Sequence, residues 1–197
     1  MRCALLVLLA LFTFSLGADA FEDNGIADLY ARGLRGDKQA VVDCIAALEA
    51  RLAREPNDQL VRVYLGSAWT LRSRDLSIGF AKLSALRKGI TLMDEAAAAA
   101  PNDCRVLLQR AVTNEAFPAI LGRRQMARTE FDKLVALVEK EPACLDPFDR
   151  QLLYLNAGLA AQRAGENRRA IELWQRGLTI NADSHLTNEI RQALAGS

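Results

Sequence analysis

Residues 154–183, YLNAGLAAQRAGENRRAIELWQRGLTINAD, contain the pattern that decides the fold. Two helix-forming stretches are separated by a turn at Gly165, because a glycine among polar residues ends one helix and lets the next begin. Gly158 in the first stretch and Ala170 in the second have small side chains, which allow two helices to approach closely. Trp174 lies one turn after Ala170, and its large ring fills the space beside this contact. The pattern predicts an antiparallel helix pair.

The signals that bound this pair recur along the chain. Pro56, Pro101, Pro142 and Asn181 lie 45, 41 and 39 residues apart. Between them the apolar residues recur at steps of three and four, which is the pattern of a helix with one apolar face. Alternation with a period of two, the strand signal, is scarce. We expect an all-α protein of about nine helices without a sheet, in which helix-turn-helix units stack to form the core.

The final unit resembles the tetratricopeptide repeat (TPR), whose 34-residue pattern places small and aromatic residues where its two helices touch. The matching positions are Gly158, Ala161, Gly165, Ala170, Trp174 and Gly177. The second unit matches in two halves, with about eleven extra residues between them. The third matches from Gly122 onward, after the interruption at Phe117-Pro118. The resemblance covers most of residues 30–182 and implies a TPR-like α-solenoid.

The resemblance also implies a function and a binding face. TPR-like repeats hold peptide segments or partner domains on the inner face of their first helices, which implies a protein-binding adaptor or scaffold. Polar side chains with an arginine would bind an extended backbone or a carboxylate there. The register of Gly158 gives Asn156 and Arg163, and the corresponding positions near Gly66 give Tyr64, Ser67 and Thr70. With Arg110 and Asn114, which lie one turn apart in the middle unit, these residues form the predicted partner-binding set.

A second interpretation is a periplasmic carrier of a lipid or small apolar ligand for an envelope transporter. In that case the longer second unit and the segment before Tyr30 would close the solenoid into a pocket. An enclosed cavity lined by Leu, Phe and Met would favour the carrier, and an open polar groove would favour the adaptor.

The start of the chain has the features of a secretory signal peptide. Arg2 supplies positive charge, residues 4–16 are uncharged and apolar, and residues 18–20 read Ala-Asp-Ala. The apolar run is shorter than the roughly 20 residues of a spanning helix. We predict cleavage after Ala20, a single TPR-like domain over residues 21–197 without a transmembrane segment, and a periplasmic or secreted bacterial protein.

Composition argues against several other functions. With 25 basic and 24 acidic residues, the chain lacks the strong positive charge of a nucleic-acid-binding protein. No G-x-S-x-G, H-E-x-x-H or G-x-x-x-x-G-K motif occurs. His185 is the only histidine, and a Cys/His zinc site needs about four ligands. We therefore expect no enzyme and no metal or cofactor, with an envelope protein or peptide as the partner.

Two basic clusters allow two interpretations. The clusters are Arg72, Arg74, Lys82, Arg87 and Lys88, and then Arg123, Arg124 and Arg128. Charged helix faces are usually only solvated. The other interpretation is contact with an anionic surface, such as lipid headgroups or an acidic patch on a partner.

Three cysteines follow the predicted leader. If residues 103–117 and 123–141 are antiparallel neighbours, Cys104 and Cys144 come within the roughly 4.4–6.8 Å between Cα atoms that a disulfide needs. Oxidation after export would favour this bridge, and both the bridged and the free state remain open. Cys44 would then be a buried thiol on an apolar stripe.

Overall fold

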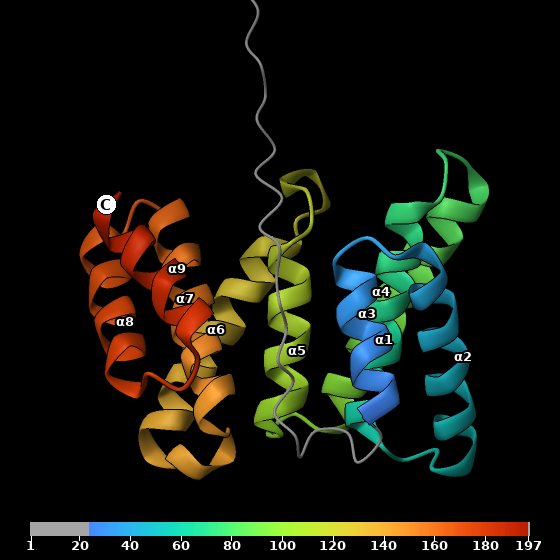
Figure 1. Ribbon diagram of the computed structural model, residues 1–197, viewed down its shortest axis with the longest axis horizontal. Helices are drawn as coiled ribbons and strands as arrows, with labels where there is room; N and C mark the ends of the chain where they lie inside the picture. Colours follow the sequence, from blue (N-terminus) through green and yellow to red (C-terminus); the bar gives the residue numbers. More distant parts are fainter. Residues whose placement is uncertain (1–23, 197) are drawn as a thin grey trace, which may run out of the picture.

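The computed structural model describes residues 24–196, and this part of the chain contains nine α-helices, two 3₁₀ helices and no strand (Figure 1). The predicted leader and its cleavage after Ala20 lie outside the described residues. The α-helices are α1 (Asn24–Leu34), α2 (Lys38–Arg54), α3 (Gln59–Asp75), α4 (Phe80–Ala99), α5 (Cys104–Glu115), α6 (Arg123–Lys140), α7 (Pro147–Arg163), α8 (Asn167–Ile180) and α9 (Ser184–Ala195). The 3₁₀ helices are η1 (Ala119–Leu121) and η2 (Pro142–Cys144). The prediction of an all-α fold of about nine helices is confirmed.

An aspartate marks the start of every repeat unit after the first. Asp58, Asp103, Asp146 and Asp183 precede α3, α5, α7 and α9, and each carboxylate accepts a bond from a backbone N–H of the first turn. These N–H groups have no partner within the helix, so each cap contributes about 1 kcal/mol. The Pro-Asn-Asp segments at 56–58 and 101–103 therefore end one unit and begin the next.

The helices pack as antiparallel pairs, α1 with α2, α3 with α4, α5 with α6 and α7 with α8, followed by α9. In the α7–α8 pair, a Cβ atom added at Gly158 would lie 2.2 Å from Nε1 of Trp174. The Trp174 ring is fully buried, and its Nε1 donates to the Leu155 carbonyl at 3.2 Å. The contact predicted from the final unit is therefore present.

The α3–α4 pair makes an even closer approach, between two backbones. A Cβ atom at Gly66 would lie 2.7 Å from the carbonyl oxygen of Gly89, and one at Gly89 would lie 2.6 Å from the carbonyl oxygen of Gly66. Neither carbonyl can move away as a flexible side chain would. The close approach of these two helices, which are 17 and 20 residues long, therefore requires glycine at both positions.

We predict that Gly66→Ala lowers the free energy of unfolding by about 1–3 kcal/mol, because the added methyl group overpacks the helix contact. Alanine alone would favour the helix by about 1 kcal/mol, so a loss reports the contact rather than helix propensity. Urea unfolding followed by circular dichroism measures the change. The control is Gly196→Ala, where the nearest atom to an added Cβ is 3.7 Å away. Equal stability of Gly66→Ala and the wild type would contradict the close packing.

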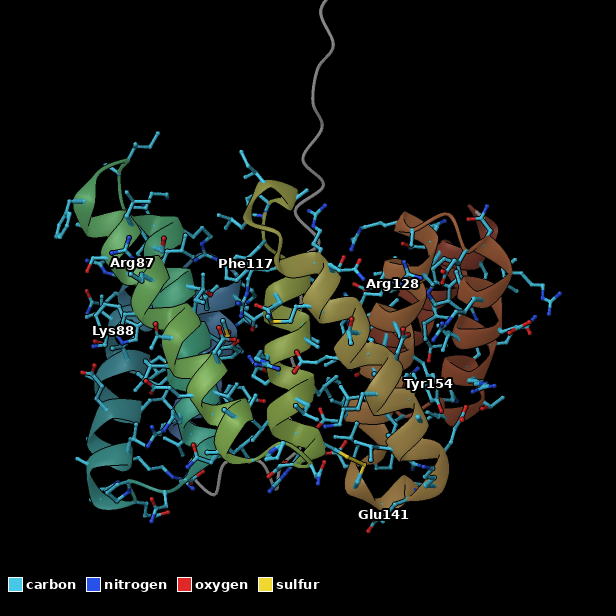
Figure 2. All side chains as sticks on the ribbon, turned by 180° about the vertical axis from the view of Figure 1, so that it is seen from behind. Arg87, Lys88, Phe117, Arg128, Glu141 and Tyr154 are labelled. Atoms are coloured by element: carbon cyan, nitrogen blue, oxygen red, sulfur yellow. A yellow bond between two sulfur atoms is a disulfide. The ribbon has the colours of Figure 1, made fainter. Side chains whose placement is uncertain are left out.

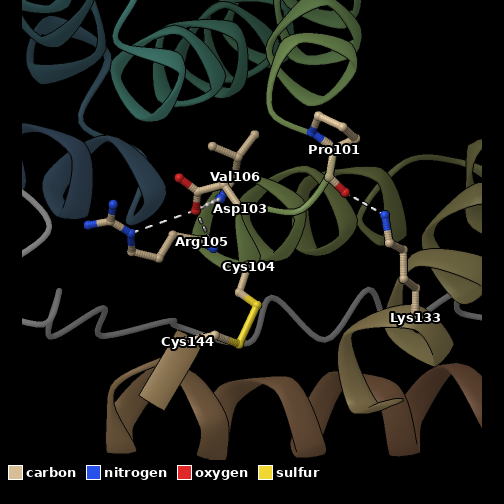
Figure 3. Close-up of a disulfide and its surroundings, with 7 residues drawn as sticks. All are labelled: Pro101, Asp103, Cys104, Arg105, Val106, Lys133 and Cys144. Atoms are coloured by element: carbon tan, nitrogen blue, oxygen red, sulfur yellow. Dashed lines mark hydrogen bonds and ion pairs between the residues drawn. A yellow bond between two sulfur atoms is a disulfide. The ribbon is translucent and has the colours of Figure 1, made fainter. Parts of the chain in front are cut away.

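A disulfide joins Cys104, at the start of α5, to Cys144 in η2 (Figure 3). The two Cα atoms are 5.9 Å apart, and 40 positions separate the residues in sequence. Nearby, Lys133 of α6 donates to the Pro101 carbonyl, which adds a second tie between α6 and the turn before α5. Cys44 is buried, and burial raises the pKa of its thiol to about 12, so it is a poor partner for exchange.

We expect removal of this bridge to destabilise the fold by about 2–4 kcal/mol, because the unfolded chain regains the freedom of a long loop. Thermal and urea unfolding with and without dithiothreitol would measure it. The Cys104→Ser/Cys144→Ser variant should be less stable than the oxidised wild type and indifferent to the reductant. A wild type that loses no stability on reduction would show that the bridge is not a stabilising element.

Candidate partner-binding face

The first helices of the units lie side by side in one row. α1, α3, α5, α7 and α9 contact one another in series, whereas α2, α4, α6 and α8 lie behind them (Figures 1 and 2). We call the side of this row that faces away from the second helices the inner face. Parallel first helices bring residues of three or more units together on it.

A buried network of side-chain hydrogen bonds fixes the first three helices of the row. The Tyr30 hydroxyl lies 2.6 Å from the Ser67 hydroxyl, which lies 2.9 Å from that of Thr113. Gln109 Nε2 donates to the Tyr30 oxygen at 2.7 Å. Burial raises the pKa of Tyr30 to about 12, so it keeps its proton at physiological pH. Because every member has a partner in this water-poor site, the network holds α1, α3 and α5 in one arrangement.

Charged and aromatic groups gather where α5 and α7 begin. Asp146 caps α7 by accepting from the Asp149 N–H at 2.8 Å, which places the two carboxylates one turn apart. The pKa of Asp149 is raised from 3.8 to about 7, mainly by burial and then by the Asp146 charge, while Arg105 opposes the change. Tyr64 of α3 is buried beside them, and burial first, then the Asp149 charge, raises its pKa well above 10. We call Tyr64, Arg105, Asp146 and Asp149 the inner-face cluster.

The second unit's members of the predicted set are turned toward neighbouring helices. Tyr64 is 7% exposed and stacks edge-on against Tyr30, with ring centroids 5.3 Å apart. Ser67 is 2% exposed and belongs to the hydrogen-bond network. The Thr70 hydroxyl donates to the Ser67 carbonyl at 2.7 Å. Intramolecular contacts therefore occupy the polar atoms of Ser67 and Thr70.

Arg110 and Asn114 belong to a charged cluster between α4, α5 and α6. Arg110 pairs with Glu130 of α6 and, at 3.2 Å, with Asp94 of α4. Arg123 pairs with Asp94 at 2.6 Å and donates to the Asn114 side-chain oxygen at 3.1 Å. The pKa of Glu130 is raised by burial, and the ion pair with Arg110 opposes part of this rise. These side chains tie the second unit to the third, away from the inner face.

The last unit supplies one accessible member of the predicted set. Asn156 is 5% exposed and donates to the Leu152 carbonyl at 2.9 Å. Arg163 pairs with the buried Glu115 of α5, and its side chain remains 48% exposed. Contact of this whole set with a partner stays a prediction, and Arg163 is the member best placed to make it.

Sequence reasoning missed Arg105, Asp146 and Asp149 as site residues. The Asp146-Pro147 pair indicates a helix start, which is correct, because Asp146 caps α7. A carboxylate three residues after a cap is ordinary in a first turn. Only the packing of α7 beside α5 and α3 brings these charges near Tyr64, and no spacing within the sequence reports it.

Comparisons with known proteins identify the fold. No protein-family model matches the sequence, and no curated protein matches it. A thermophilic TPR protein of Thermus thermophilus, known from its crystal structure, superposes with a TM-score of 0.62 at 18% identity. The match covers 86% of this chain and 81% of that one.

Asp149 predicts how stability depends on pH. Its raised pKa means that the folded state holds this proton more tightly than the unfolded state does. The stabilisation is complete below about pH 4, is lost as the pH rises to about 7, and changes no further above that. Asp149→Asn should therefore be more stable than the wild type by about 2–4 kcal/mol at pH 8 and about equal to it at pH 4.

Urea unfolding of both proteins at the two pH values measures this difference. The control is Asp28→Asn, whose carboxylate is 63% exposed and should show little change. A difference between Asp149→Asn and the wild type that stayed the same at both pH values would argue against a protonated Asp149.

Both helix-pair geometry and the extent of this superposition lead to the same conclusion: the described part of the chain has the TPR-like helical-repeat fold.

Proposed function

We propose that this chain is an exported TPR-like adaptor or scaffold of the cell envelope, which holds a partner protein or peptide on its inner face. A TPR-like fold suggests protein binding, and the observation that carries the proposal is the inner-face cluster. Arg105, Asp146 and Asp149 lie at the starts of α5 and α7, so two neighbouring units contribute charge to one region, with the buried Tyr64 ring of α3 beside it. An extended segment lying across these two helices would meet the charged members.

The charges of the cluster favour a basic partner segment. Asp146 and Asp149 supply two carboxylates against the single positive charge of Arg105. A lysine or arginine of the partner would pair with Asp149 and favour its ionised form, in the position where burial now disfavours that charge. The buried Tyr64 ring lies beside this position within the protein. Arg163, farther along α7, would contact a carboxylate or carbonyl of the same segment.

Export is proposed from the first 20 residues, which have the signal-peptide pattern. The Cys104–Cys144 disulfide accords with an oxidising compartment such as the periplasm. Within the described residues, none of the helices has the length and hydropathy needed to cross a membrane.

The carrier interpretation would require an enclosed apolar cavity. Two depressions of about 550 and 270 Å³ lie along α8 and are open to solvent. Their lining is largely charged, with Glu166, Arg168, Arg169 and Glu172 at the first and Asp132, Glu139, Arg169 and Arg176 at the second. These depressions do not favour a lipid as cargo, so the adaptor is the function that we propose.

In-cell crosslinking of the tagged chain in its native host, followed by mass spectrometry, tests the proposal. We expect the crosslinking to recover one dominant envelope protein. The Asp149→Asn and Arg163→Ala variants should each recover less of it than the wild type does. The matched control is Arg168→Ala on α8, whose side chain is 95% exposed and lies away from the inner face. Asn114 and Asn156 are poorer choices, because their burial links any loss of binding to a loss of folding.

The recovered partner provides a second readout. Its affinity for the wild type should rise about tenfold from pH 6 to pH 8, since a basic side chain binds the ionised form of a group with a pKa of about 7. Asp149→Asn should lack this dependence. Recovery that is equal for all variants and for the control would refute the inner face as the binding site, and co-purifying lipid without a protein would support the carrier.

A further inference from the structure

Exposed apolar side chains gather on two turns at one end of the solenoid. The α3–α4 turn and the α5–α6 turn, which contains η1, both protrude at the end where the first helices finish (Figures 1 and 2). Of seven large hydrophobic side chains exposed in the described residues, six belong to these turns and the first turns that follow. They are Ile78, Phe80, Leu83, Ile120, Leu121 and Met126, and we call the two groups the apolar tips.

The most prominent members are almost completely exposed. Ile78, Phe80 and Ile120 keep 97%, 86% and 93% of their surface accessible. Single exposed hydrophobic residues are ordinary on a protein surface, whereas clusters of them mark sites of interaction. Two clusters on adjacent protruding turns therefore indicate a binding partner whose surface contacts both turns.

Basic side chains hold the backbone of each tip in place through hydrogen bonds to carbonyl oxygens rather than through ion pairs. Lys82 Nζ donates to the carbonyls of Ser73 and Leu76 at 2.8 and 3.2 Å, which holds the first tip. Arg124 Nε donates to the Phe117 carbonyl at 2.9 Å, which holds the second. Because a carbonyl carries no net charge, both cations keep their full positive charge beside the exposed apolar residues.

Within the two tips themselves the charged residues have one sign, whereas the acidic residues that directly precede them, Asp75 and Glu115, are paired with Arg74 and Arg163. No acidic residue occurs in residues 76–93 or 116–129. Within the described part of the chain, Arg72, Lys82, Arg87 and Arg124 form no ion pair with a carboxylate. Figure 2 shows Arg87 and Arg128 toward this end.

The turns at the opposite end of the solenoid differ from the tips. These turns contain the acidic residues Glu55, Asp58, Asp103, Glu141 and Asp146, followed by Asp149 in the first turn of α7, and Glu141 lies there in Figure 2. None of the exposed large hydrophobic side chains of the described residues lies in those turns. The two tips are therefore both basic and apolar, unlike the turns at the opposite end.

We infer that the tip end docks on the surface of an anionic lipid bilayer, with Ile78, Phe80 and Ile120 inserted at the headgroup boundary. A bilayer is a plane that two protruding turns contact together, and interfacial binding combines apolar insertion with basic residues at anionic headgroups. The apolar side chains lie at turn apices rather than along one groove, so a folded partner or a helix has no channel to fill. The inner-face cluster lies at the other end and stays free for a protein.

Vesicle flotation tests this inference on the chain purified from its native host, with its N-terminus read by mass spectrometry. The vesicles are phosphatidylcholine alone, or phosphatidylcholine with about 30 mol% phosphatidylglycerol. We expect binding to the anionic vesicles only, weakened in about 0.5 M NaCl because salt screens the basic residues. Ile78→Ser/Phe80→Ser and Ile120→Ser should each lower the partition coefficient about tenfold, since each removes inserted apolar surface.

Val42→Ser is the matched control, because Val42 is the seventh exposed hydrophobic residue, lies on α2 and belongs to neither tip. It should bind like the wild type. A Phe80→Trp variant should also be quenched by brominated acyl chains more strongly than the wild type, whose Trp69 and Trp174 lie within the helices. All the substitutions are at exposed positions, so circular dichroism should be unchanged.

Equal flotation of the tip variants, Val42→Ser and the wild type would overturn the inference. So would loss of a crosslinked protein by the tip variants without any change in flotation, which would assign the tips to a protein partner. Capture of a partner through Asp149, which lies at the opposite end of the solenoid, is independent of either result, so failure of this inference and failure of the adaptor proposal are distinguishable.

Discussion

The fold depends on how closely the two helices of a unit can approach. At Gly66 and Gly89 the backbones of α3 and α4 come together with no room for a Cβ on either side. At Gly158 the missing side chain is replaced by the ring of Trp174. These contacts set the separation within a pair, and the pair then offers one shared apolar surface to the next unit. The aspartate caps have a separate role, because they determine where each first helix begins but not how close its partner helix lies.

This constraint explains what could be predicted from the sequence. Gly158, Ala170 and Trp174 have the spacing of the TPR helix pair, and proline and aspartate signals mark the unit boundaries, so the all-α repeat fold could be predicted. The site was less predictable from the sequence. Helical periodicity places Ser67, Arg110 and Asn156 on a polar side of their helices, yet each finds a partner within the protein. A polar position in a repeat can bind a neighbouring helix or a foreign chain, and periodicity does not separate the two.

Buried polar contacts divide the work of holding the units together. Tyr30, Ser67 and Gln109 join α1, α3 and α5 on one side, and the charged cluster around Arg110 joins α4, α5 and α6 on the other. Both groups involve α5, so the second and third units are fixed from two directions. Satisfied polar networks of this kind favour one arrangement over its alternatives, because any shift would leave a buried group without a partner. A row of helices held in this way presents its inner face in one shape.

A nearly neutral net charge conceals a division between the two ends of the solenoid. The formal net charge is +1, yet the two apolar tips contain basic residues and no acidic ones, whereas carboxylates recur in the turns at the other end. Asp149 belongs to the acidic end, where burial disfavours its charge and so favours its protonated form. A group that is costly to ionise in the free protein is the place where a positive ligand gains most, because the ligand supplies the missing counter-charge. The cost to stability at Asp149 and its suitability for binding therefore have the same physical origin.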